Sequence, residues 1–240
     1  MSLDPRAIVL TPFGANRSSD VVLALTSAGA DPHVMSVTDL LTTQRTVLDA
    51  QMLVVAGGFS DATPLSAGHK FSLELAHSVG DQLRSFVAAG KPVVGIASGF
   101  QALIRTGILP GALALNSSGH FQCEWVELEA PATRCLWTQG LSPIECPITS
   151  SEGRYVHPDP ETLADNGQVA LRYRHTNPNG SVANIAGVCD ATGVVLGMMP
   201  NPEHHVLPRQ HPQYRMPQHT AGSRLALSIF ERGVRHVRKA

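Results

Sequence analysis

Residues 93–101 read Val-Val-Gly-Ile-Ala-Ser-Gly-Phe-Gln. An apolar run leads to Gly95, a second glycine stands at position 99, and a helical pattern follows. This is the spacing of a nucleophile elbow, Gly-x-Nuc-x-Gly, in which a strand turns sharply into a helix and presents the central side chain. The central residue is Ala97, whose methyl group can neither attack a carbonyl carbon nor lose a proton. The sequence therefore predicts the scaffold of a catalytic site without its reacting atom.

Strand and helix patterns alternate on both sides of the elbow in the first hundred residues. The predicted strands cover residues 7–10, 33–37, 52–56 and 92–96, and the predicted helices cover 20–28, the region from Leu75 to Val87, and 100–105. The strands at 53–56 and 93–96 are apolar throughout, as expected where both faces of a sheet are covered. This order predicts an α/β fold with a parallel sheet between helices.

The second half has a different pattern. Residues 122–129 alternate between apolar and polar side chains, and further short strands are predicted at 169–173, 186–189 and 194–199. Asn-Pro-Asn-Gly at 177–180 predicts a turn, and 191–193 predicts a hairpin connection. We expect an antiparallel extension of the same sheet, an amphipathic closing helix from Ala226 onward, and one domain over 1–240.

Composition excludes several classes of function. The chain has 240 residues and a net charge of −1, which gives no electrostatic case for binding nucleic acid. It contains no apolar run long enough for a membrane span and no signal-peptide pattern, so a cytoplasmic location is expected. The four cysteines form no Cys-x-x-Cys pair, so neither a zinc site nor a redox dithiol is predicted. No metal or cofactor is expected.

Two polar segments near the C-terminus are interpreted without a specific role. Residues 202–219 contain four prolines and four histidines without recognisable metal-ligand spacing, and we interpret them as a surface loop. The basic residues between Arg232 and Lys239 are expected to complement the helix dipole and remain solvated, although a basic patch is the alternative.

Several segments, in order along the chain, resemble one family. Gly-Gly-Phe-Ser at 57–60, Gly-Ile-Ala-Ser-Gly-Phe-Gln at 95–101, Asn-Pro-Asn-Gly-Ser at 177–181 and Gly-Met-Met-Pro-Asn-Pro-Glu at 197–203 carry the resemblance. They resemble the glutaminase subunits and domains of phosphoribosylformylglycinamidine synthase, which are class I glutamine amidotransferases of purine biosynthesis. The resemblance implies a flavodoxin-like fold, a Cys-His-Glu triad, and a large ATP-dependent synthetase partner that receives ammonia from glutamine.

The resemblance places the triad on Ala97, Asn201 and Glu203. It also implies that Gly57, Gly58, Phe59, Ser98 and Gln101 form the oxyanion hole and ligand-binding positions. An alanine replaces the nucleophile, and an asparagine, whose amide has no useful basicity, replaces the base. The family's His-Gly-Glu-Gly motif also loses its histidine, because residues 150–153 read Ser-Ser-Glu-Gly.

Loss of a nucleophile or a base from such a triad typically costs about a million-fold in turnover. We therefore expect that the chain does not hydrolyse glutamine by the family mechanism. One hypothesis is a catalytically impaired subunit that still docks on a synthetase. A second is a module that binds glutamine or a related small molecule without cleaving it. A third is an enzyme of altered chemistry with Glu203 or Glu152 as base. Without its histidine, Glu203 is interpreted as an exposed loop acid with no partner, and Gln101 has capping of the first helical turn as its structural alternative.

Overall fold

The computed structural model describes residues 4–12, 18–42, 46–58, 67–216 and 224–239. Five parallel strands form one half of its main sheet, in the order β2-β1-β3-β4-β11. They are β1 (Arg6–Thr11), β2 (Asp31–Ser36), β3 (Met52–Val55), β4 (Val93–Ile96) and β11 (Val195–Met198). An order of 2-1-3-4-5 is that of flavodoxin-like folds. The predicted α/β fold is confirmed.

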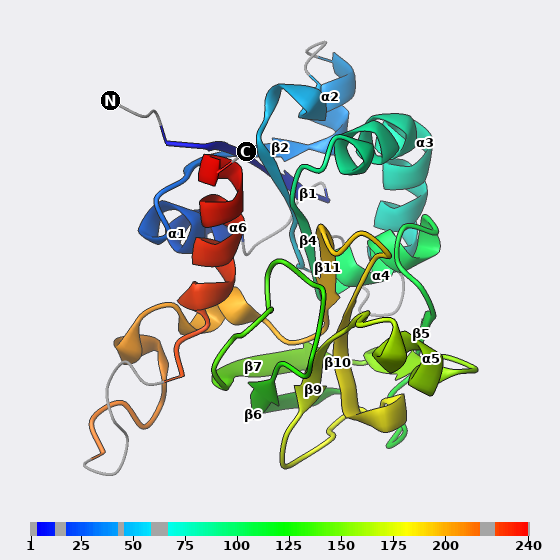
Figure 1. The fold of residues 1–240 in the computed structure, drawn as a ribbon, viewed down its shortest axis with the longest axis vertical. Coiled ribbons are helices and arrows are strands. Elements are labelled where there is room, and N and C mark those ends of the chain that lie inside the picture. Colours follow the sequence, from blue (N-terminus) through cyan, green and yellow to red (C-terminus); the bar gives the residue numbers. More distant parts are fainter. Residues whose placement is uncertain (1–3, 13–17, 43–45, 59–66, 217–223, 240) are drawn as a thin grey trace.

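Helices cover both faces of these strands (Figure 1). Helices α1 (Ser18–Ser27) and α6 (Leu227–Lys239) lie on one face, and α3 (Ala67–Ala88) and α4 (Ser98–Arg105) lie together on the other. A short helix, α2 (Val37–Thr42), follows β2 and contacts α3. Val9, Val54 and Val94, in three adjacent strands, have no exposed surface. This two-sided burial explains why the strand sequences are apolar throughout.

Four antiparallel strands extend the sheet beyond β11, in the order β10-β9-β6-β7. They are β10 (Ile185–Cys189), β9 (Val169–Tyr173), β6 (Gln122–Glu129) and β7 (Ile144–Ser150). The predicted antiparallel extension is confirmed, but the strand predicted at 194–199, which was expected to belong to it, is β11 of the parallel half and pairs with β4. Strand β7 was missed because Pro147 interrupts its pattern. Proline is tolerated in edge strands, where a missing N–H need not break a ladder, and β7 is the edge of this sheet.

The remaining elements are short. Strands β5 (Ala112–Ala114) and β8 (Arg154–Val156) form a separate antiparallel pair, and α5 (Pro160–Asp165) precedes β9. The 3-10 turns are η1 (Val47–Asp49), η2 (Val182–Asn184), η3 (Pro202–His205) and η4 (Pro208–Gln210). Of these, η3 packs against β7, so the segment after β11 lies on the sheet rather than away from it.

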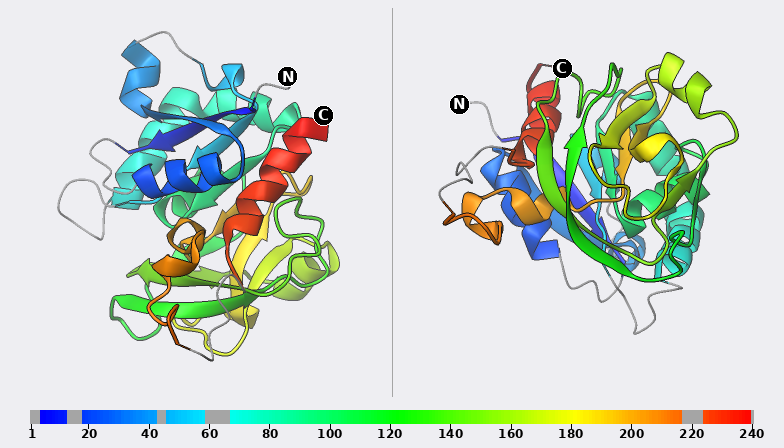
Figure 2. Two further views of the ribbon diagram at one scale, coloured as in Figure 1. Left: turned by 90° about the vertical axis from the view of Figure 1, so that its left-hand side faces the viewer. Right: turned by 90° about the horizontal axis from the view of Figure 1, so that it is seen from below.

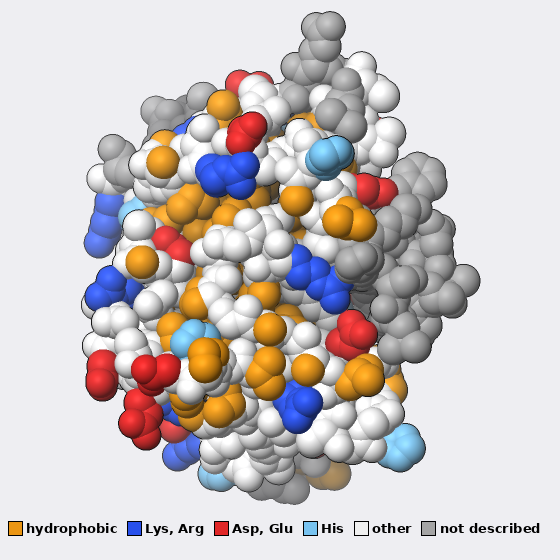
Figure 3. All heavy atoms as spheres, turned by 90° about the vertical axis from the view of Figure 1, so that its right-hand side faces the viewer, with side chains coloured by type: hydrophobic (Ala, Val, Ile, Leu, Met, Phe, Trp, Pro, Cys, Tyr) orange, Lys and Arg blue, Asp and Glu red, His pale blue; other side chains and the backbone are white. Residues whose placement is uncertain are grey.

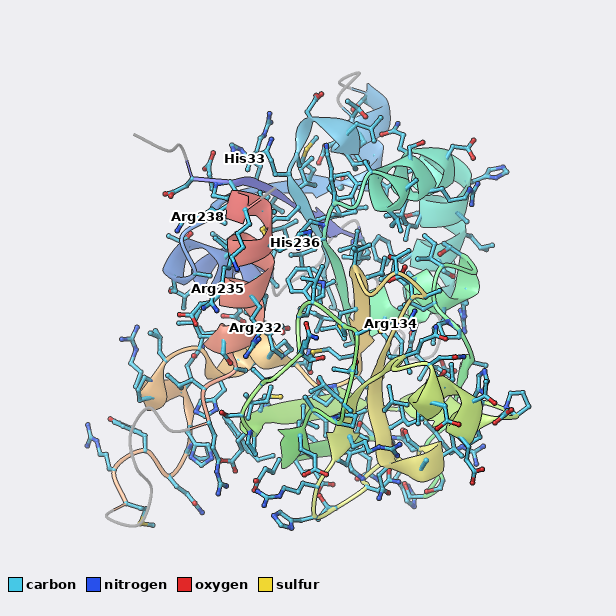
Figure 4. The ribbon with its side chains drawn as sticks, viewed as in Figure 1. His33, Arg134, Arg232, Arg235, His236 and Arg238 are labelled. Atoms are coloured by element: carbon cyan, nitrogen blue, oxygen red, sulfur yellow. The ribbon has the colours of Figure 1, made fainter. Side chains whose placement is uncertain are left out.

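The basic residues of α6 fasten the helix to distant segments. Arg232 donates hydrogen bonds to the carbonyls of Gln139 and Gly140, and Arg238 donates to the carbonyl of Gly29 and to Asp4. His236 lies 3.2 Å from the carbonyl oxygen of Gly90. Figure 4 shows these side chains along α6, and Figure 2 shows that the helix runs from the β6–β7 end of the molecule towards β1. Arg235, Arg238 and Lys239 are exposed, as expected, whereas Arg232 and His236 are half-buried.

Candidate functional site

The predicted elbow lies between β4 and α4. Ala97 adopts φ 50° and ψ −110°, a conformation that is strained for a residue with a side chain. Its N–H donates to the carbonyl of Met198 on the neighbouring strand, at 2.9 Å. A Cβ on Gly99 would lie 1.9 Å from the carbonyl oxygen of Val55, and one on Gly95 would lie 2.5 Å from Leu103. Both glycines are therefore required for the packing of this strand–helix turn, whatever residue stands at its centre.

The end of β3 approaches the elbow from the adjacent strand. A Cβ on Gly57 would lie 3.1 Å from the Cβ of Ala97, so the backbone of Gly57 borders the methyl group. Gly58 has φ +142°, a conformation that glycine adopts readily. The hydroxyl of Ser98 donates to the carbonyl of Gly58 at 3.2 Å. The Ser98 side chain is therefore engaged with the end of β3. Phe59 lies outside the described residues, and its role stays a prediction.

The positions predicted for the base and the orienting acid, Asn201 and Glu203, lie just beyond β11, the strand next to β4. Asn201 is buried, and its Nδ2 donates to Oε1 of Glu203 at 3.2 Å. Thr149 donates to Oδ1 of Asn201, also at 3.2 Å. Asn201, the predicted base position, is therefore hydrogen-bonded to Glu203, the predicted orienting acid. It supplies an orienting hydrogen bond to the carboxylate, but its amide cannot accept a proton at neutral pH.

Glu203 was interpreted as an exposed acid without a partner, and this interpretation is wrong. Only 1% of Glu203 is exposed, and its carboxylate accepts the Asn201 hydrogen bond. Nε2 of His204 lies 3.7 Å from Oε1 of Glu203 and 3.4 Å from Oδ2 of Asp20. The packing of η3 against β7 buries the acid. Because β7 was not predicted, no surface that could bury Glu203 was expected next to it.

The histidine-rich segment is also more buried than predicted. His205 has no exposed surface, and its Nδ1 lies within hydrogen-bonding distance of the carbonyl of Glu145. His211 is 3% exposed, and its ring centre lies 4.3 Å from that of Trp125. The surface-loop interpretation is therefore wrong for these two residues. His219 lies outside the described residues.

Gln101 connects the elbow helix to a second loop. Its Nε2 donates to the carbonyl of Glu152 at 2.8 Å, while its own N–H donates to the carbonyl of Ala97 at 3.1 Å. The side chain therefore reaches across to residues 150–153 instead of capping the first turn of its own helix. This contact was not predicted, because it joins residues 51 positions apart.

The cysteines offer no evident substitute for the nucleophile. Cys135, Cys146 and Cys189 are buried and Cys123 is exposed. Burial, reinforced by the Glu203 and Glu145 carboxylates, raises the pKa of the Cys146 thiol well above its usual value. That thiol is therefore neutral at physiological pH, and it lies within β7 instead of at the elbow.

Metal ligands and membrane spans can be assessed for the same part of the chain. Among the described residues, no group of three or more His, Cys, Asp or Glu side chains is arranged to hold a metal ion. None of the helices in the described ranges has the length and apolar character needed to cross a bilayer. Figure 3 shows acidic, basic and apolar side chains interspersed on one face of the molecule, which agrees with the near-zero net charge.

Comparison with known proteins assigns the chain to a family. Residues 4–237 match the model of the CobB/CobQ-like glutamine amidotransferase domain. The chain belongs to this family. A phosphoribosylformylglycinamidine synthase subunit PurQ from Treponema denticola is 37% identical, over 98% of this chain and 100% of that protein. The PurQ subunit from Nostoc sp. is 45% identical over 65% of this chain and 71% of that protein.

Solved structures show the same likeness. A chain in the structure of PurLQS from Thermotoga maritima has a TM-score of 0.78 and 30% identity, with 97% of this chain and 99% of that chain covered. A glutamine amidotransferase from Thermotoga maritima has a TM-score of 0.61 at 11% identity, covering 98% of this chain and 99% of that chain. The second likeness shows the shared fold alone. The resemblance to class I glutamine amidotransferases is thus confirmed.

Proposed function

We propose that this chain is a glutaminase-like subunit of the phosphoribosylformylglycinamidine synthase type in which hydrolysis of glutamine has been lost. Its role would be that of a docking or structural subunit for a large ATP-dependent synthetase. The PurQ relatives and the PurLQS structure support the assignment to this type of subunit. The proposal includes a single amidotransferase-like domain over the whole chain and a cytoplasmic location.

The observation that carries the proposal is the methyl group at the centre of the elbow. In this family mechanism, a thiolate attacks the amide carbon and an imidazole moves the proton. Ala97 supplies no atom for the attack, and Asn201 supplies no base. The glycine turn, the Ser98 hydroxyl contact and the buried Glu203 remain. They can bind and orient a ligand, but they do not replace either reacting group.

Two measurements test the proposal. The tagged full chain, expressed in its own host, should co-purify with a large ATP-dependent synthetase. The purified pair, supplied with glutamine, should release no glutamate above background, whereas the synthetase should turn over with ammonium chloride. Glutamate release above about one per second, an ordinary enzymatic rate, would show that the chain is an active glutaminase. Failure to co-purify with any synthetase would refute the docking role.

A second candidate function is retention of a small molecule without cleavage. The acid at position 203 favours this alternative, because it remains buried and hydrogen-bonded although the histidine it would orient is absent. A ligand at one hundred times its dissociation constant adds about 2.7 kcal/mol of stability. Glutamine should then raise the melting temperature of the isolated chain, and the absence of any shift at tens of millimolar would argue against binding.

A further inference from the structure

Two cysteines from distant segments meet beneath the segment that joins β6 to β7. Cys135 belongs to this segment, Cys189 is the last residue of β10, and both are buried. The Cys189 thiol donates a hydrogen bond to the sulfur of Cys135, and both thiols are free. The spacing of the cysteines in the chain gave no indication of this pair, because the fold alone brings the two segments together.

Backbone contacts fix the segment around Cys135 to the end of β10. The residues on either side of Cys135 donate backbone hydrogen bonds to the carbonyls of Gly167 and Gly193, both at 2.9 Å. Sγ of Cys189 lies 3.7 Å from the same Gly167 carbonyl oxygen. A Cβ on Gly193 would lie 2.4 Å from the carbonyl oxygen of Arg134, so the two segments are in close contact. These contacts hold the two sulfur atoms next to each other.

The two thiols differ in their hydrogen bonds. Burial opposes ionisation of Cys135, but hydrogen bonds from Cys189, from the Thr138 hydroxyl and from the N–H groups of Trp137 and Thr138 outweigh it and lower the pKa of this thiol. The buried Thr138 hydroxyl has no other hydrogen-bond partner among the described residues. Donation to Cys135, burial and the nearby Cys135 and Asp190 charges raise the pKa of Cys189. Cys135 is therefore the nucleophile of the pair, and Cys189 keeps its proton.

The pair lies close to the molecular surface. Arg134, immediately before Cys135, is exposed, and Leu136, immediately after it, is half-buried. A small opening of this segment is enough to admit a molecule of the size of hydrogen peroxide, and such local opening requires far less free energy than global unfolding.

We propose that Cys135 and Cys189 are a modification site, at which a hydroperoxide converts the two thiols into a disulfide. The Cys135 sulfur attacks one peroxide oxygen, the O–O bond breaks, and the other oxygen takes a proton and leaves as water or an alcohol. The Cys189 sulfur then attacks the sulfenic acid on Cys135, the S–S bond forms, and the hydroxyl leaves as water. The two thiols lose two electrons and two protons in total, and the peroxide is reduced. Neither cysteine lies at the elbow, so this inference does not depend on the proposed loss of hydrolysis.

Peptide mapping of the peroxide-treated wild-type chain tests the proposal. The full-length chain is reduced, freed of reductant, exposed to hydrogen peroxide at pH 7, and then unfolded and alkylated, so that only unreacted thiols are labelled. The product should have lost the mass of two hydrogen atoms, and the peptide containing Cys135 should be joined to the peptide containing Cys189. Because the cross-link closes a loop of roughly fifty residues, it should raise the melting temperature by about ten degrees. Dithiothreitol should reverse both changes.

Three variants separate the roles of the two sulfur atoms. In Cys189→Ala, dimedone should trap a sulfenic acid on Cys135, because no second thiol remains to displace the hydroxyl. In Cys135→Ala, dimedone should label Cys189 at least about tenfold more slowly, because that thiol keeps its proton. Cys146→Ala removes a buried thiol outside the pair and is the matched control. It should form the cross-link as fast as the wild type.

Three results of the mapping would overturn the proposal. They are a cross-link to Cys123 or Cys146 instead, oxidation of Cys135 to a sulfinic or sulfonic acid without a cross-link, and unreacted Cys135 and Cys189 after the exposed Cys123 has been fully oxidised. The mapping needs only the wild-type chain, so a variant that fails to fold leaves the test intact.

Discussion

If the proposed loss of hydrolysis is correct, introducing a cysteine at position 97 and a histidine at position 201 together should give glutamine hydrolysis, whereas either substitution alone should not. Ala97→Cys supplies a nucleophile on a backbone that already has the elbow conformation, so no new backbone strain is introduced. Asn201→His supplies a base whose ring N–H can donate to Glu203 in place of the present amide. The side effect is small, because Thr149 loses one acceptor at a cost of about 1 kcal/mol.

The expected gain follows from two magnitudes. A complete triad raises the turnover number about a million-fold, and the loss of one member removes nearly all of this increase. A misplacement of about 1 Å in an unoptimised site costs about a hundredfold. The double variant should therefore release glutamate about ten-thousandfold faster than either single variant, which corresponds to about 5 kcal/mol of transition-state stabilisation. Both single variants should remain within about tenfold of the wild-type background.

The assay measures glutamate release with and without the co-purified synthetase, together with mass spectrometry for a glutamyl thioester on the introduced cysteine. Ser98→Cys combined with Asn201→His is the control, because position 98 directs its side chain towards the Gly58 carbonyl. It should stay inactive. A double variant no faster than Ala97→Cys alone, or a control as fast as the double variant, would refute the assignment of the elbow centre and the base position.

Three further predictions concern stability, and each is measured by urea unfolding. Gly99→Ala should lower the free energy of unfolding by about 3 kcal/mol or more, because its Cβ would clash with the Val55 carbonyl. Gly80→Ala in α3, where a Cβ would meet only the Arg84 side chain at 3.6 Å, should raise the free energy of unfolding by about 1 kcal/mol. Similar effects of the two changes would contradict the packing argument. Arg232→Ala should lower the free energy of unfolding by about 1–2 kcal/mol, because the side chain loses its two hydrogen bonds to carbonyl groups. Arg235 is exposed and has no partner among the described residues, so Arg235→Ala should lower it by less than about 0.5 kcal/mol. Equal losses would show that the Arg232 contacts do not stabilise the fold. The raised pKa of Cys146 means that the folded state keeps a proton which the unfolded state releases above about pH 9, so stability should fall with rising pH there by up to about 1.4 kcal/mol per pH unit. Cys146→Ala should show a shallower decline between pH 9 and 10, and an unchanged slope would contradict the assigned cause.

The elbow could be predicted from the sequence because its geometry has few solutions. Two glycines four positions apart, after an apolar run, match the close approaches at Gly95 and Gly99. The alternation of strands and helices likewise predicted four of the five parallel strands, whereas β11 was expected in the antiparallel extension. Both features are encoded by the spacing of residues close together in the chain, so a single sequence is enough to predict them.

The surroundings of the site could not be predicted in the same way. The burial of Glu203 depends on β7, and Pro147 concealed that strand. The contact of Gln101 with Glu152 depends on how two distant segments meet, and no local pattern encodes it. His205 and His211 sit in a proline-rich stretch that has the composition of a loop, yet the stretch packs on the sheet.

The tight approach of Gly99 to the strand beside it has a consequence for how this family evolves. A substitution that removes the reacting sulfur leaves the turn intact, but a substitution at either flanking glycine would disrupt the sheet itself. Selection for a folded chain alone is thus sufficient to preserve the outline of the motif after its chemistry has gone. The spacing of the glycines alone therefore does not show whether a chain is a working enzyme, and the residue between them has to be inspected in each protein.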